Sequence, residues 1–430
     1  MTSDQLADLY ALYLRSSGVS TDTRSIGAGN LFFALRGESF NGNAFAQQAL
    51  QQGALAAVVD EPAQAVEGCL LVDNVLQALQ QLALHHRRQL GTKIVGITGT
   101  NGKTTTKELL SAVLGAGRCV MATRGNLNNH IGVPLTLLAL RPEVEVAVVE
   151  MGANHPNDIE ELVQIAQPDY GLITNIGRAH LAGFGSEAGV VRAKTALYRY
   201  LAQHDGVAFY NDSNGLLAEQ IGLCGLRCAV PYSAALDAPA RVFDSGGYLS
   251  MELSIGGTVH RLDTQLVGRY NAENVLAALA VGVHFGISVG DALGAIAAYA
   301  PSNNRSQRIS TGRNVVIMDA YNANPSSMAV AIEAFASAAA ERKVAIVGQM
   351  LELGERSAEE HQRVVEQLRE AHLDAVMLVG EGFVDCDAPY PRYATAAECA
   401  AELERHRIAG ATVLLKGSRG VGLERLLPLL

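Results

Sequence analysis

This sequence has few charged and few aromatic residues, and among the charged ones basic residues are fewer than acidic ones. Of its 430 residues, 18% are charged and 5% are aromatic, tryptophan is absent, and the formal net charge is −10. A negative overall field argues against a broad nucleic-acid-binding surface. Any anionic ligand must therefore be bound by a local group of basic residues.

Cysteine is sparse and scattered. Of the six cysteines, only Cys224 and Cys228 lie close together, with no second pair and no nearby histidine. This spacing argues against a structural zinc site. We expect reduced thiols, as in a protein of the cytoplasm.

Long apolar runs are also lacking. No stretch approaches the ~20 residues that a membrane-spanning helix needs. The N-terminal sequence MTSDQLADLYALYL has acidic residues where a secretory signal would carry basic ones. The sequence therefore predicts a cytoplasmic protein with no membrane span.

Glycine and aliphatic residues are plentiful, as expected for strands and helices joined by tight turns. The chain has 43 glycines and is 49% hydrophobic. Its length suggests roughly two to four domains, because single hydrophobic cores rarely grow beyond ~250 residues. We expect three domains, at residues 1–90, 91–300 and 301–430, with residues 301–304 as a linker.

The pattern of apolar segments predicts an α/β fold. Strands alternate with helices in the second and third domains, which predicts doubly wound, mostly parallel sheets with ligands at the carboxyl ends of the strands. We expect a small N-terminal α/β domain, a central phosphate-loop sheet and a C-terminal Rossmann-like domain. Residues 240–267 alternate around Gly-Gly turns and predict antiparallel hairpins appended to the central sheet. Strands are expected at 55–59, 93–98, 146–149, 171–174, 207–209, 315–318, 344–347, 376–379 and 412–415, and helices at 75–90 and, as a pair, at 272–300.

Residues 93–110, KIVGITGTNGKTTTKELL, predict a phosphate-binding loop. An apolar strand leads into a glycine turn and then into a helix, whose free N–H groups and positive dipole end face an anion. Lys103 is placed to reach the outer phosphates, and the Thr104 hydroxyl is placed to bind magnesium. Ile97 stands where the general motif has its first glycine, so GTNGKTT is a variant of that motif. The loop predicts binding of a nucleoside triphosphate.

Three further candidates lie near the ends of central strands. Glu150 ends the strand at 146–149, His180 follows the strand at 171–174, and Lys194 lies 14 residues later on a predicted helix. A carboxylate and an imidazole beside a phosphate loop are plausible ligands for hard divalent cations. Taken singly, such a histidine is usually a satisfied polar residue and such a lysine a solvated one, but as a set in one domain with a phosphate loop they favour a functional site.

A loop rich in asparagine precedes a predicted apolar helix in TRGNLNNHIGVPLTLL. Asn126, Asn128 and Asn129 could cap that helix or form its preceding turn. Three amides beside a phosphate site also suit an amide-rich or peptide substrate. Both interpretations stay open on the sequence.

The third domain places polar residues at two strand ends. Asp319 ends a strand in VVIMDAYNANPSSM, where an acid can bind a ribose hydroxyl or a metal-bound water. The sequence LLKGSRG forms a basic turn, at Lys416, Ser418 and Arg419, that suits a carboxylate or phosphate. Arg305 or Arg308 offers a cation near the linker.

Taken together, these motifs resemble those of the Mur ligases, the ATP-dependent amino-acid ligases of peptidoglycan precursor synthesis. The resemblance runs nearly end to end and includes TDTRSIGAGNLFFALRGESFNGNAF, GITGTNGKTTTKELL, GNLNNHIGVPLTLL, EMGANHPNDI, TNIGRAHLAGFGS, AKTALY, GRYNAENVLAAL, DAYNANPSSM, VGQMLELGERSAEEH and LKGSRG. GNLNN-x-IGVP, YNANP-x-SM and M-x-ELG are more particular to the branch that adds D-alanyl-D-alanine. The phosphate loop and the Glu–His–Lys set also occur in folylpolyglutamate synthetase.

The resemblance implies an ATP and metal site. Thr104 and Glu150 would hold one of two Mg²⁺ ions, and His180 and Lys194 the other, with Lys103, Glu150, His180 and Lys194 as catalytic residues. Lys194 is expected as its carbamate, because an ammonium cannot ligate a cation whereas the CO₂ adduct is an anionic oxygen ligand. The residues implied to bind ATP are Gly99, Thr100, Asn101, Gly102, Lys103, Thr104, Thr105, Asn271 and Asn274 (near adenine), Arg305, and Asp319 (near ribose).

The resemblance also implies a substrate site. The substrates would be UDP-N-acetylmuramoyl-tripeptide, held partly by the first domain, and D-alanyl-D-alanine, with the third domain closing over ATP. The implied substrate-binding residues are Thr23, Arg24, Asn43, Asn126, Asn128, Asn129, Tyr321, Asn322, Asn324, Lys416, Ser418 and Arg419. The sequence departs from the family at Asn41-Gly42-Asn43, where Asp-Gly-His is common, and at the linker arginine, where NNRSQR replaces a Gly-Arg pair.

The family resemblance implies a ligase that acts as a monomer through an acyl phosphate. Transfer of the γ-phosphoryl group activates a peptide carboxylate, and the amine of D-alanyl-D-alanine then displaces phosphate. The enzyme that adds the third residue of the peptide would lack GNLNN and YNANP in this form, and folylpolyglutamate synthetase lacks the N-terminal domain. A Mur-like protein that only binds nucleotide would have lost one of the four catalytic residues, all of which are present.

Overall fold

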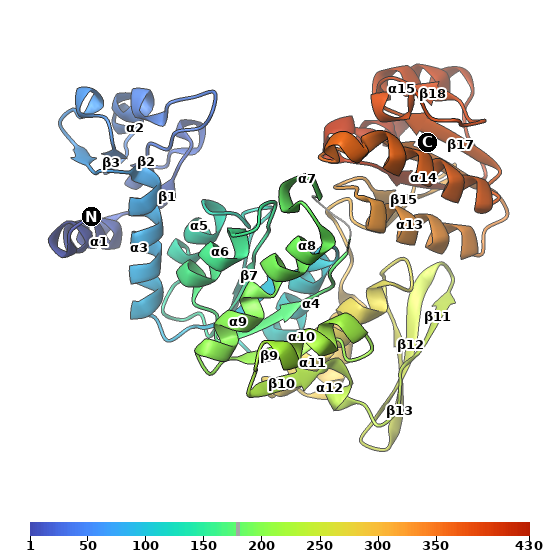
Figure 1. The fold of residues 1–430 in the computed structure, drawn as a ribbon, viewed down its shortest axis with the longest axis horizontal. Coiled ribbons are helices and arrows are strands. Elements are labelled where there is room, and N and C mark those ends of the chain that lie inside the picture. The colour runs from blue at the N-terminus through green and yellow to red at the C-terminus, as the bar shows by residue number, and fades with distance from the viewer. Residues whose placement is uncertain (178–180) are drawn as a thin grey trace.

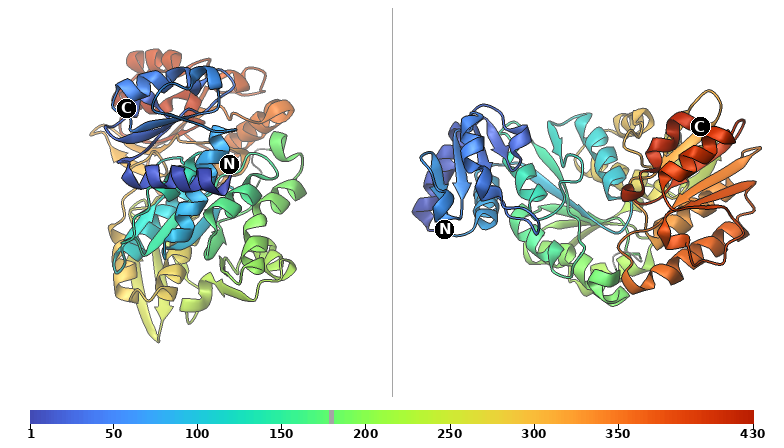
Figure 2. Two further views of the ribbon diagram at one scale, coloured as in Figure 1. Left: turned by 90° about the vertical axis from the view of Figure 1, so that its left-hand side faces the viewer. Right: turned by 90° about the horizontal axis from the view of Figure 1, so that it is seen from above.

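The computed structural model describes residues 1–177 and 181–430, and it has an α/β fold, as predicted. Three parts lie in a row, with the N-terminal and C-terminal parts at opposite ends of the central part (Figures 1 and 2). In the described ranges no helix is long and apolar enough to cross a membrane.

The N-terminal part is a small parallel sheet of order β1-β2-β3-β4 with helices beside it. Its last helix, α3, is apolar along one side and packs against α1 and also against α5 and α6 of the central part. The N-terminal and central parts therefore share one hydrophobic core. The elements are α1 (Ser3–Arg15), β1 (Gly18–Ser20), β2 (Asn30–Phe33), α2 (Ala46–Gln51), β3 (Ala56–Val59), β4 (Cys69–Leu71) and α3 (Val75–Gln89).

The central part is built on a parallel sheet of order β10-β9-β8-β5-β7-β6. Alternate side chains of β5 face opposite layers: Ile94 packs in the core shared with α3, and Val95 packs in a second core with α4 and α11. The sheet is buried on both faces, which explains why its strands read as continuous apolar runs. Its elements are β5 (Lys93–Thr98), α4 (Lys103–Gly115), β6 (Val120–Ala122), α5 (Gly132–Leu138), β7 (Val146–Glu150), α6 (Asp158–Ala166), β8 (Tyr170–Ile173), α7 (Leu181–Phe184), α8 (Glu187–Lys194), α9 (Ala196–Gln203), β9 (Val207–Tyr210), α10 (Gly215–Leu223) and β10 (Cys228–Pro231).

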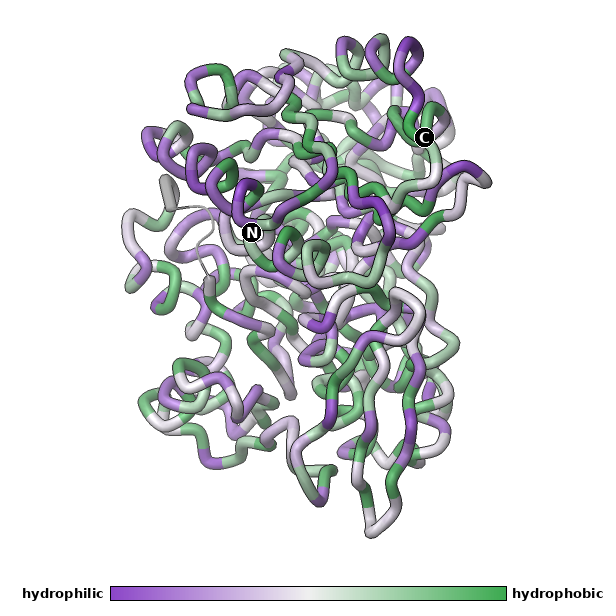
Figure 3. The backbone as a smooth tube through the Cα atoms, turned by 90° about the vertical axis from the view of Figure 1, so that its right-hand side faces the viewer, coloured by the Kyte–Doolittle hydropathy of each residue, from purple (hydrophilic) through white to green (hydrophobic). Residues whose placement is uncertain are grey.

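The predicted hairpins are present. The sequence suggested that they extend the central sheet, whereas they form a separate three-stranded sheet. β11 (Arg241–Ser245), β12 (Tyr248–Ile255) and β13 (Thr258–Asp263) pair antiparallel and project from the molecule (Figure 1). Hydrophilic and hydrophobic residues are interspersed along these strands (Figure 3), because one face packs on the core and the other faces water. The predicted helix pair follows as α11 (Asn271–His284) and α12 (Val289–Ala298).

The C-terminal part has a mixed sheet of order β14-β15-β19-β16-β17-β18, in which β14 alone pairs antiparallel. The four inner strands match the predicted ones, whereas the short edge strands β14 and β18 carry too few apolar residues to be predicted. The elements are β14 (Gln307–Ser310), β15 (Val315–Asp319), α13 (Pro325–Ser337), β16 (Lys343–Gly348), α14 (Ser357–Glu370), β17 (Ala375–Val379), β18 (Arg392–Tyr393), α15 (Ala396–Arg405) and β19 (Thr412–Lys416).

Candidate active site

The phosphate loop connects β5 to α4 at the carboxyl edge of the central sheet. Gly99 and Gly102 have φ values of 145° and 81°, and Gly102 is the N-cap of α4. A Cβ at Gly99 would lie 1.9 Å from Thr174 Oγ1, and one at Gly102 would lie 2.6 Å from Asn274 Oδ1. Both conformation and space therefore require glycine at these two positions.

The neighbouring strand β8 braces this loop through the residues that follow it. Thr174 Oγ1 donates to the Asn101 carbonyl at 2.6 Å, and Asn101 N donates to Asn175 Oδ1 at 3.0 Å. Thr100 Oγ1 accepts from Gly177 N at 3.0 Å. The loop is thus held in shape by hydrogen bonds from a second strand end.

Two lysines converge on one carbonyl of the loop. Lys103 Nζ donates to the carbonyls of Gly99 at 2.8 Å and Thr100 at 3.1 Å, and Lys194 Nζ donates to the Gly99 carbonyl at 3.0 Å. Burial lowers the pKa of both amines, and the proximity of Lys103 lowers the pKa of Lys194 further. Lys194, at the end of α8, is 2% exposed. The predicted lysines therefore lie together at the phosphate loop.

Glu150, the last residue of β7, is buried beside the start of α4. Its Oε2 accepts from Thr104 Oγ1 at 3.0 Å, and its Oε1 accepts from Asn128 Nδ2 at 2.8 Å. Lys107 Nζ lies 3.9 Å from Glu150 Oε2 and donates to the Thr123 carbonyl at 2.8 Å. A carboxylate and a hydroxyl oxygen 3.0 Å apart are hard donors of the kind that Mg²⁺ prefers, so these two residues fit a magnesium site.

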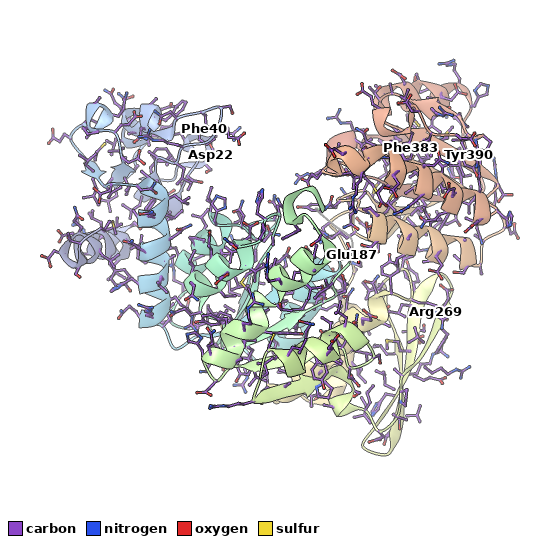
Figure 4. All side chains as sticks on the ribbon, in the orientation of Figure 1. Asp22, Phe40, Glu187, Arg269, Phe383 and Tyr390 are labelled. Atoms are coloured by element: carbon purple, nitrogen blue, oxygen red, sulfur yellow. The ribbon has the colours of Figure 1, made fainter. Side chains whose placement is uncertain are left out.

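Of the second predicted metal pair, His180 lies outside the described residues and Lys194 lies at the phosphate loop. In residues 1–177 and 181–430, no group of three His, Cys, Asp or Glu side chains is arranged to hold a metal ion. Figure 4 shows Glu187, at the start of α8, close to the gap between the central and C-terminal parts. Lys194 ends that same helix.

The three asparagines of the GNLNN loop have different surroundings. Asn129 Oδ1 accepts from the backbone N–H groups of Ile131 and Gly132, as a capping side chain does. Asn128 instead donates to Glu150, and Asn126 is exposed. Asn129 therefore fits the turn and capping interpretation, whereas substrate binding by Asn126 and Asn128 stays a prediction.

Asn271 and Asn274 form a buried relay against the phosphate-loop helix. Asn274 Nδ2 donates to Asn271 Oδ1 at 2.8 Å, and Thr106 Oγ1 donates to Asn274 Oδ1 at 2.9 Å. Asn271 Nδ2 donates to the Val267 carbonyl. Thr105, predicted to bind ATP, lies beside Thr104 in the first turn of α4.

The C-terminal part contacts the phosphate loop directly. Asn324 Nδ2 donates to Asn101 Oδ1 at 2.9 Å, and Asn101 Nδ2 donates to Ser326 Oγ at 3.0 Å. Asn324 is also the N-cap of α13, where its Oδ1 accepts from Ser327 N. This predicted substrate residue therefore joins two elements of the protein.

At the ends of β15 and β19, the partly buried Asp319 and the buried Lys416 form an ion pair. Lys416 Nζ lies 3.0 Å from Asp319 Oδ2 and donates to the Asn322 carbonyl at 2.8 Å. Asp319 Oδ1 accepts from Ser306 N. Ser418 Oγ accepts from Leu351 N at 3.0 Å, so it fixes the MLELG loop.

The two candidate arginines of the linker region face different ways. The Arg305 guanidinium stacks 3.9 Å from the Tyr321 ring centroid, and its positive charge contributes to lowering the pKa of Lys103. Arg419 also approaches the Tyr321 ring, at 5.4 Å. Arg308 lies over the ring of Tyr248 in β12. The geometry favours Arg305 as the residue that faces the phosphate loop.

The predicted sugar-site residues lie in the N-terminal part. Thr23 and Arg24 form the turn η1 (Thr23–Ser25), and the exposed Arg24 pairs with Asp22 at 2.6 Å. Asp22 is well separated from Glu187 in Figure 4. Asn43 is fully buried, and its side-chain amide bonds to Asp60 and Asn41. The Asn43 side chain therefore makes hydrogen bonds inside the N-terminal part, and Thr23 and Arg24 are the accessible members of this set.

Sequence reasoning did not single out Lys107, Asn175 or Ser326. Lys107 lies one helical turn after Lys103, so the helical period would have placed both lysines on one side of α4. Asn175 and Ser326 stand inside motifs that were recognised, TNIG and YNANPSSM. Their partners lie far away in the chain, and that pairing requires the structure.

Family models match most of the chain. The model described as Mur ligase middle domain matches residues 97–282, the one described as Mur ligase, glutamate ligase domain matches 304–419, and the one described as Mur ligase family, catalytic domain matches 15–87.

Individual relatives are similar over the whole length. The UDP-N-acetylmuramoyl-tripeptide–D-alanyl-D-alanine ligase of Escherichia coli is 35% identical, with 99% of this chain and 97% of the relative covered. The crystal structure of MurF from Acinetobacter baumannii is 30% identical with a TM-score of 0.88, covering 100% of this chain and 98% of that one. MurF from Thermotoga maritima, solved with ADP, is 27% identical with a TM-score of 0.85, covering 97% of both chains.

Proposed function

This chain belongs to the Mur ligase family, and from that membership we propose that it is the ATP-dependent ligase that joins D-alanyl-D-alanine to UDP-N-acetylmuramoyl-tripeptide. The products are the extended peptide, ADP and phosphate, and the reaction belongs to peptidoglycan precursor synthesis. The observation that carries the proposal is the end-to-end similarity to ligases of this specificity, together with the phosphate loop and Glu150 facing the C-terminal part.

Lys103 would stabilise the transferring phosphoryl group. In the structure its ammonium rests on the carbonyls of Gly99 and Thr100, at the turn where the phosphates would lie. Binding of ATP would draw this ammonium away from the carbonyls and onto the γ-phosphate. Charge that develops there in the transition state is then met by a positioned cation.

Thr104 and Glu150 would hold a magnesium ion, because their hydroxyl and carboxylate oxygens are adjacent and hard. Bound Mg²⁺ would offset negative charge on the phosphates. We further propose that Lys194 acts as its carbamate and, with His180, holds a second ion. Carbamate formation requires a neutral amine, and the burial that lowers the pKa of Lys194 supports this.

The three parts would divide the work. The N-terminal part would bind the UDP-sugar end through Thr23 and Arg24, and residues 91–300 would bind ATP. Residues 301–430 would bind D-alanyl-D-alanine near Tyr321, Asn322, Asn324, Lys416, Ser418 and Arg419. Closure of the C-terminal part over the central part would exclude water from the acyl phosphate. We place a monomeric enzyme in the cytoplasm, where ATP and UDP-linked precursors are available.

The test is phosphate release with UDP-N-acetylmuramoyl-tripeptide and ATP. We expect release with D-alanyl-D-alanine as acceptor and little release with glutamate or diaminopimelate. Mass spectrometry of the product should show the added dipeptide. Equal rates with all three acceptors, or release without any acceptor, would contradict the assigned specificity.

A further inference from the structure

Positive charge accumulates around the buried carboxylate of Glu150. Lys103 and Lys194 both donate to the Gly99 carbonyl, close to the start of α4. A third lysine, Lys107, has its ammonium 3.9 Å from Glu150 Oε2. The roles proposed above account for Lys103 and Lys194, and they leave Lys107 without a function.

Lys107 is held rigidly in this position. It is 4% exposed, and its ammonium donates to the carbonyl of Thr123 at 2.8 Å. The hydroxyl of Thr123 in turn accepts from the backbone N–H of Glu150 at 3.0 Å. One residue therefore fixes both the lysine and the strand end that carries the carboxylate.

In this geometry the buried carboxylate oxygens accept hydrogen bonds from neutral donors and not from the lysine. The Glu150 carboxylate accepts hydrogen bonds from Thr104 and Asn128, and the Lys107 ammonium is hydrogen-bonded to a backbone carbonyl. A buried carboxylate without a nearby positive charge is strongly destabilising. Lys107 supplies that charge from 3.9 Å without a hydrogen bond to the carboxylate.

We propose that Lys107 is a positioning residue that serves as the resident counter-ion of Glu150 and prevents a divalent cation from binding before nucleotide does. The inference rests on the magnesium site proposed at Thr104 and Glu150. With Lys107 in place, the charge of Glu150 is already offset, so a free cation gains little and is repelled by the ammonium. The phosphates of ATP add negative charge, and only then does cation binding become favourable. The metal would thus enter with the nucleotide.

The test uses metal ions alone, without nucleotide or acceptor. Lys107→Gln removes the charge but keeps a donor near the Thr123 carbonyl, and Lys107→Arg keeps the charge. Lys93→Gln is the matched control, because Lys93 is an exposed lysine at the start of β5 that pairs with Asp169. Mn²⁺ binding is measured by electron paramagnetic resonance, and the melting temperature is measured over a range of MgCl₂ concentrations.

We expect Lys107→Gln to bind Mn²⁺ on the order of tenfold more tightly than the wild type, or better, because one nearby like charge is removed. Its melting temperature should be lower than that of the wild type without metal, and the difference should shrink as MgCl₂ is added. Lys107→Arg and Lys93→Gln should resemble the wild type in Mn²⁺ binding.

Wild-type Mn²⁺ affinity in Lys107→Gln, with a melting deficit that MgCl₂ does not change, would overturn the proposal and leave Lys107 as a packing residue. Tight Mn²⁺ binding by Lys107→Arg would also overturn it. If Lys107→Gln is unfolded without metal, refolding on addition of Mn²⁺ supports the proposal and failure to refold refutes it. Neither readout involves ATP turnover or D-alanyl-D-alanine, so an error in the assigned acceptor would leave them unchanged.

Discussion

At the scale of single residues, the Gly99 carbonyl accepts hydrogen bonds from both Lys103 and Lys194. Negative charge develops on the γ-phosphate during phosphoryl transfer and not on this carbonyl, so the lysine would act in catalysis by moving to the phosphate. We therefore expect Lys103→Ala to lose on the order of 10² to 10⁴ in kcat, as happens when other transition-state donors are removed. Phosphate release measures the loss, and the exposed Lys93→Ala is the control. Activity within a few-fold of the wild type would show that the loop is wrongly assigned.

Lys194 gives a second prediction at this scale. If its carbamate supplies anionic oxygens, Lys194→Ala should be nearly inactive, and acetate added to the assay should partly restore turnover by entering the vacated space. Removing CO₂ at mildly acidic pH should lower wild-type activity, and bicarbonate should restore it, because the carbamate forms only from the neutral amine. The simpler alternative is a buried ammonium that only braces the Gly99 carbonyl and takes no part in metal binding. An active Lys194→Ala, indifferent to both additives, would favour that role.

Asn128 and Asn129 are adjacent yet should behave differently. Asn129→Ala removes the acceptor of two N–H groups at the start of α5 and should cost ~1 kcal/mol of stability, as loss of a capping side chain does, with little change in kinetics. Asn128→Ala leaves Glu150 Oε1 without its amide donor, so it should raise the KM for ATP–magnesium or lower kcat well beyond its effect on melting temperature. Thermal unfolding and steady-state kinetics of the pair separate the two. Kinetic constants that are equal in both variants would contradict the division.

The contrast between these neighbours shows how far the sequence alone reaches. The sequence predicted that these asparagines either cap a helix or bind substrate, but it could not assign a role to each one. That assignment depends on which asparagine contacts Glu150, the last residue of β7. Asn43 was predicted to bind substrate, but it is buried against Asp60. Lys107 was overlooked, because its partners are Thr123, which follows β6, and Glu150, which ends β7. Residue types follow from local chemistry, whereas their partners follow from the packing of the sheet.

At the scale of whole elements, the long buried strands and helices could be predicted because their apolar periodicity is strong. The strands β1, β2, β4, β6, β10, β14 and β18 were not predicted. All are short, and all except β2 lie at sheet edges, where half-buried residues leave little periodic signal. β14 also reverses direction in a sheet that is otherwise parallel, which local sequence does not specify. The hairpins were predicted, and their separation from the central sheet was not.

Helix α3 shows how one element joins two parts. His86 lies on α3 between α1 and the central part. Its Nε2 is 3.1 Å from the Tyr13 hydroxyl of α1 and 3.2 Å from the Leu140 carbonyl. Burial holds the pKa of His86 below its usual value of 6.5. Between the folded-state pKa and 6.5, the unfolded chain binds more protons than the folded one. Stability from this site is therefore complete above about pH 6.5 and is lost as the pH falls.

We accordingly expect the melting temperature of the wild type to drop between pH 7.5 and 5.5, and His86→Gln to show a smaller drop. His85→Gln is the matched control, because His85 packs on the Tyr10 ring and makes no hydrogen bond to the 138–140 segment. Scanning calorimetry at the two pH values provides the comparison. A drop of equal size in His86→Gln and the wild type would mean that other groups set the pH dependence.

At the scale of the whole molecule, the phosphate loop and the C-terminal part are joined by a few polar contacts. Asn101 bonds to Asn324 and Ser326, while Tyr270 of the central part bonds to Ser306, which in turn donates from its backbone to Asp319. Polar contacts of this kind can break and reform when domains move, unlike a large apolar interface. We therefore expect nucleotide binding at the phosphate loop to affect α13 through the hydrogen bonds of Asn101.

A double-mutant cycle tests this link between the two parts. Asn101→Ala and Asn324→Ala should each lower kcat/KM for ATP, and the double variant should lose less than the sum, with a coupling on the order of 1 kcal/mol, because the two side chains share one hydrogen bond. Asn314 provides the control: its amide bonds to the Ile408 carbonyl at the opposite end of β15 from Asp319. Asn101→Ala combined with Asn314→Ala should therefore be additive. Additivity in the Asn101–Asn324 pair would mean that the contact does not persist during turnover, and α13 would then have to respond to nucleotide by another route.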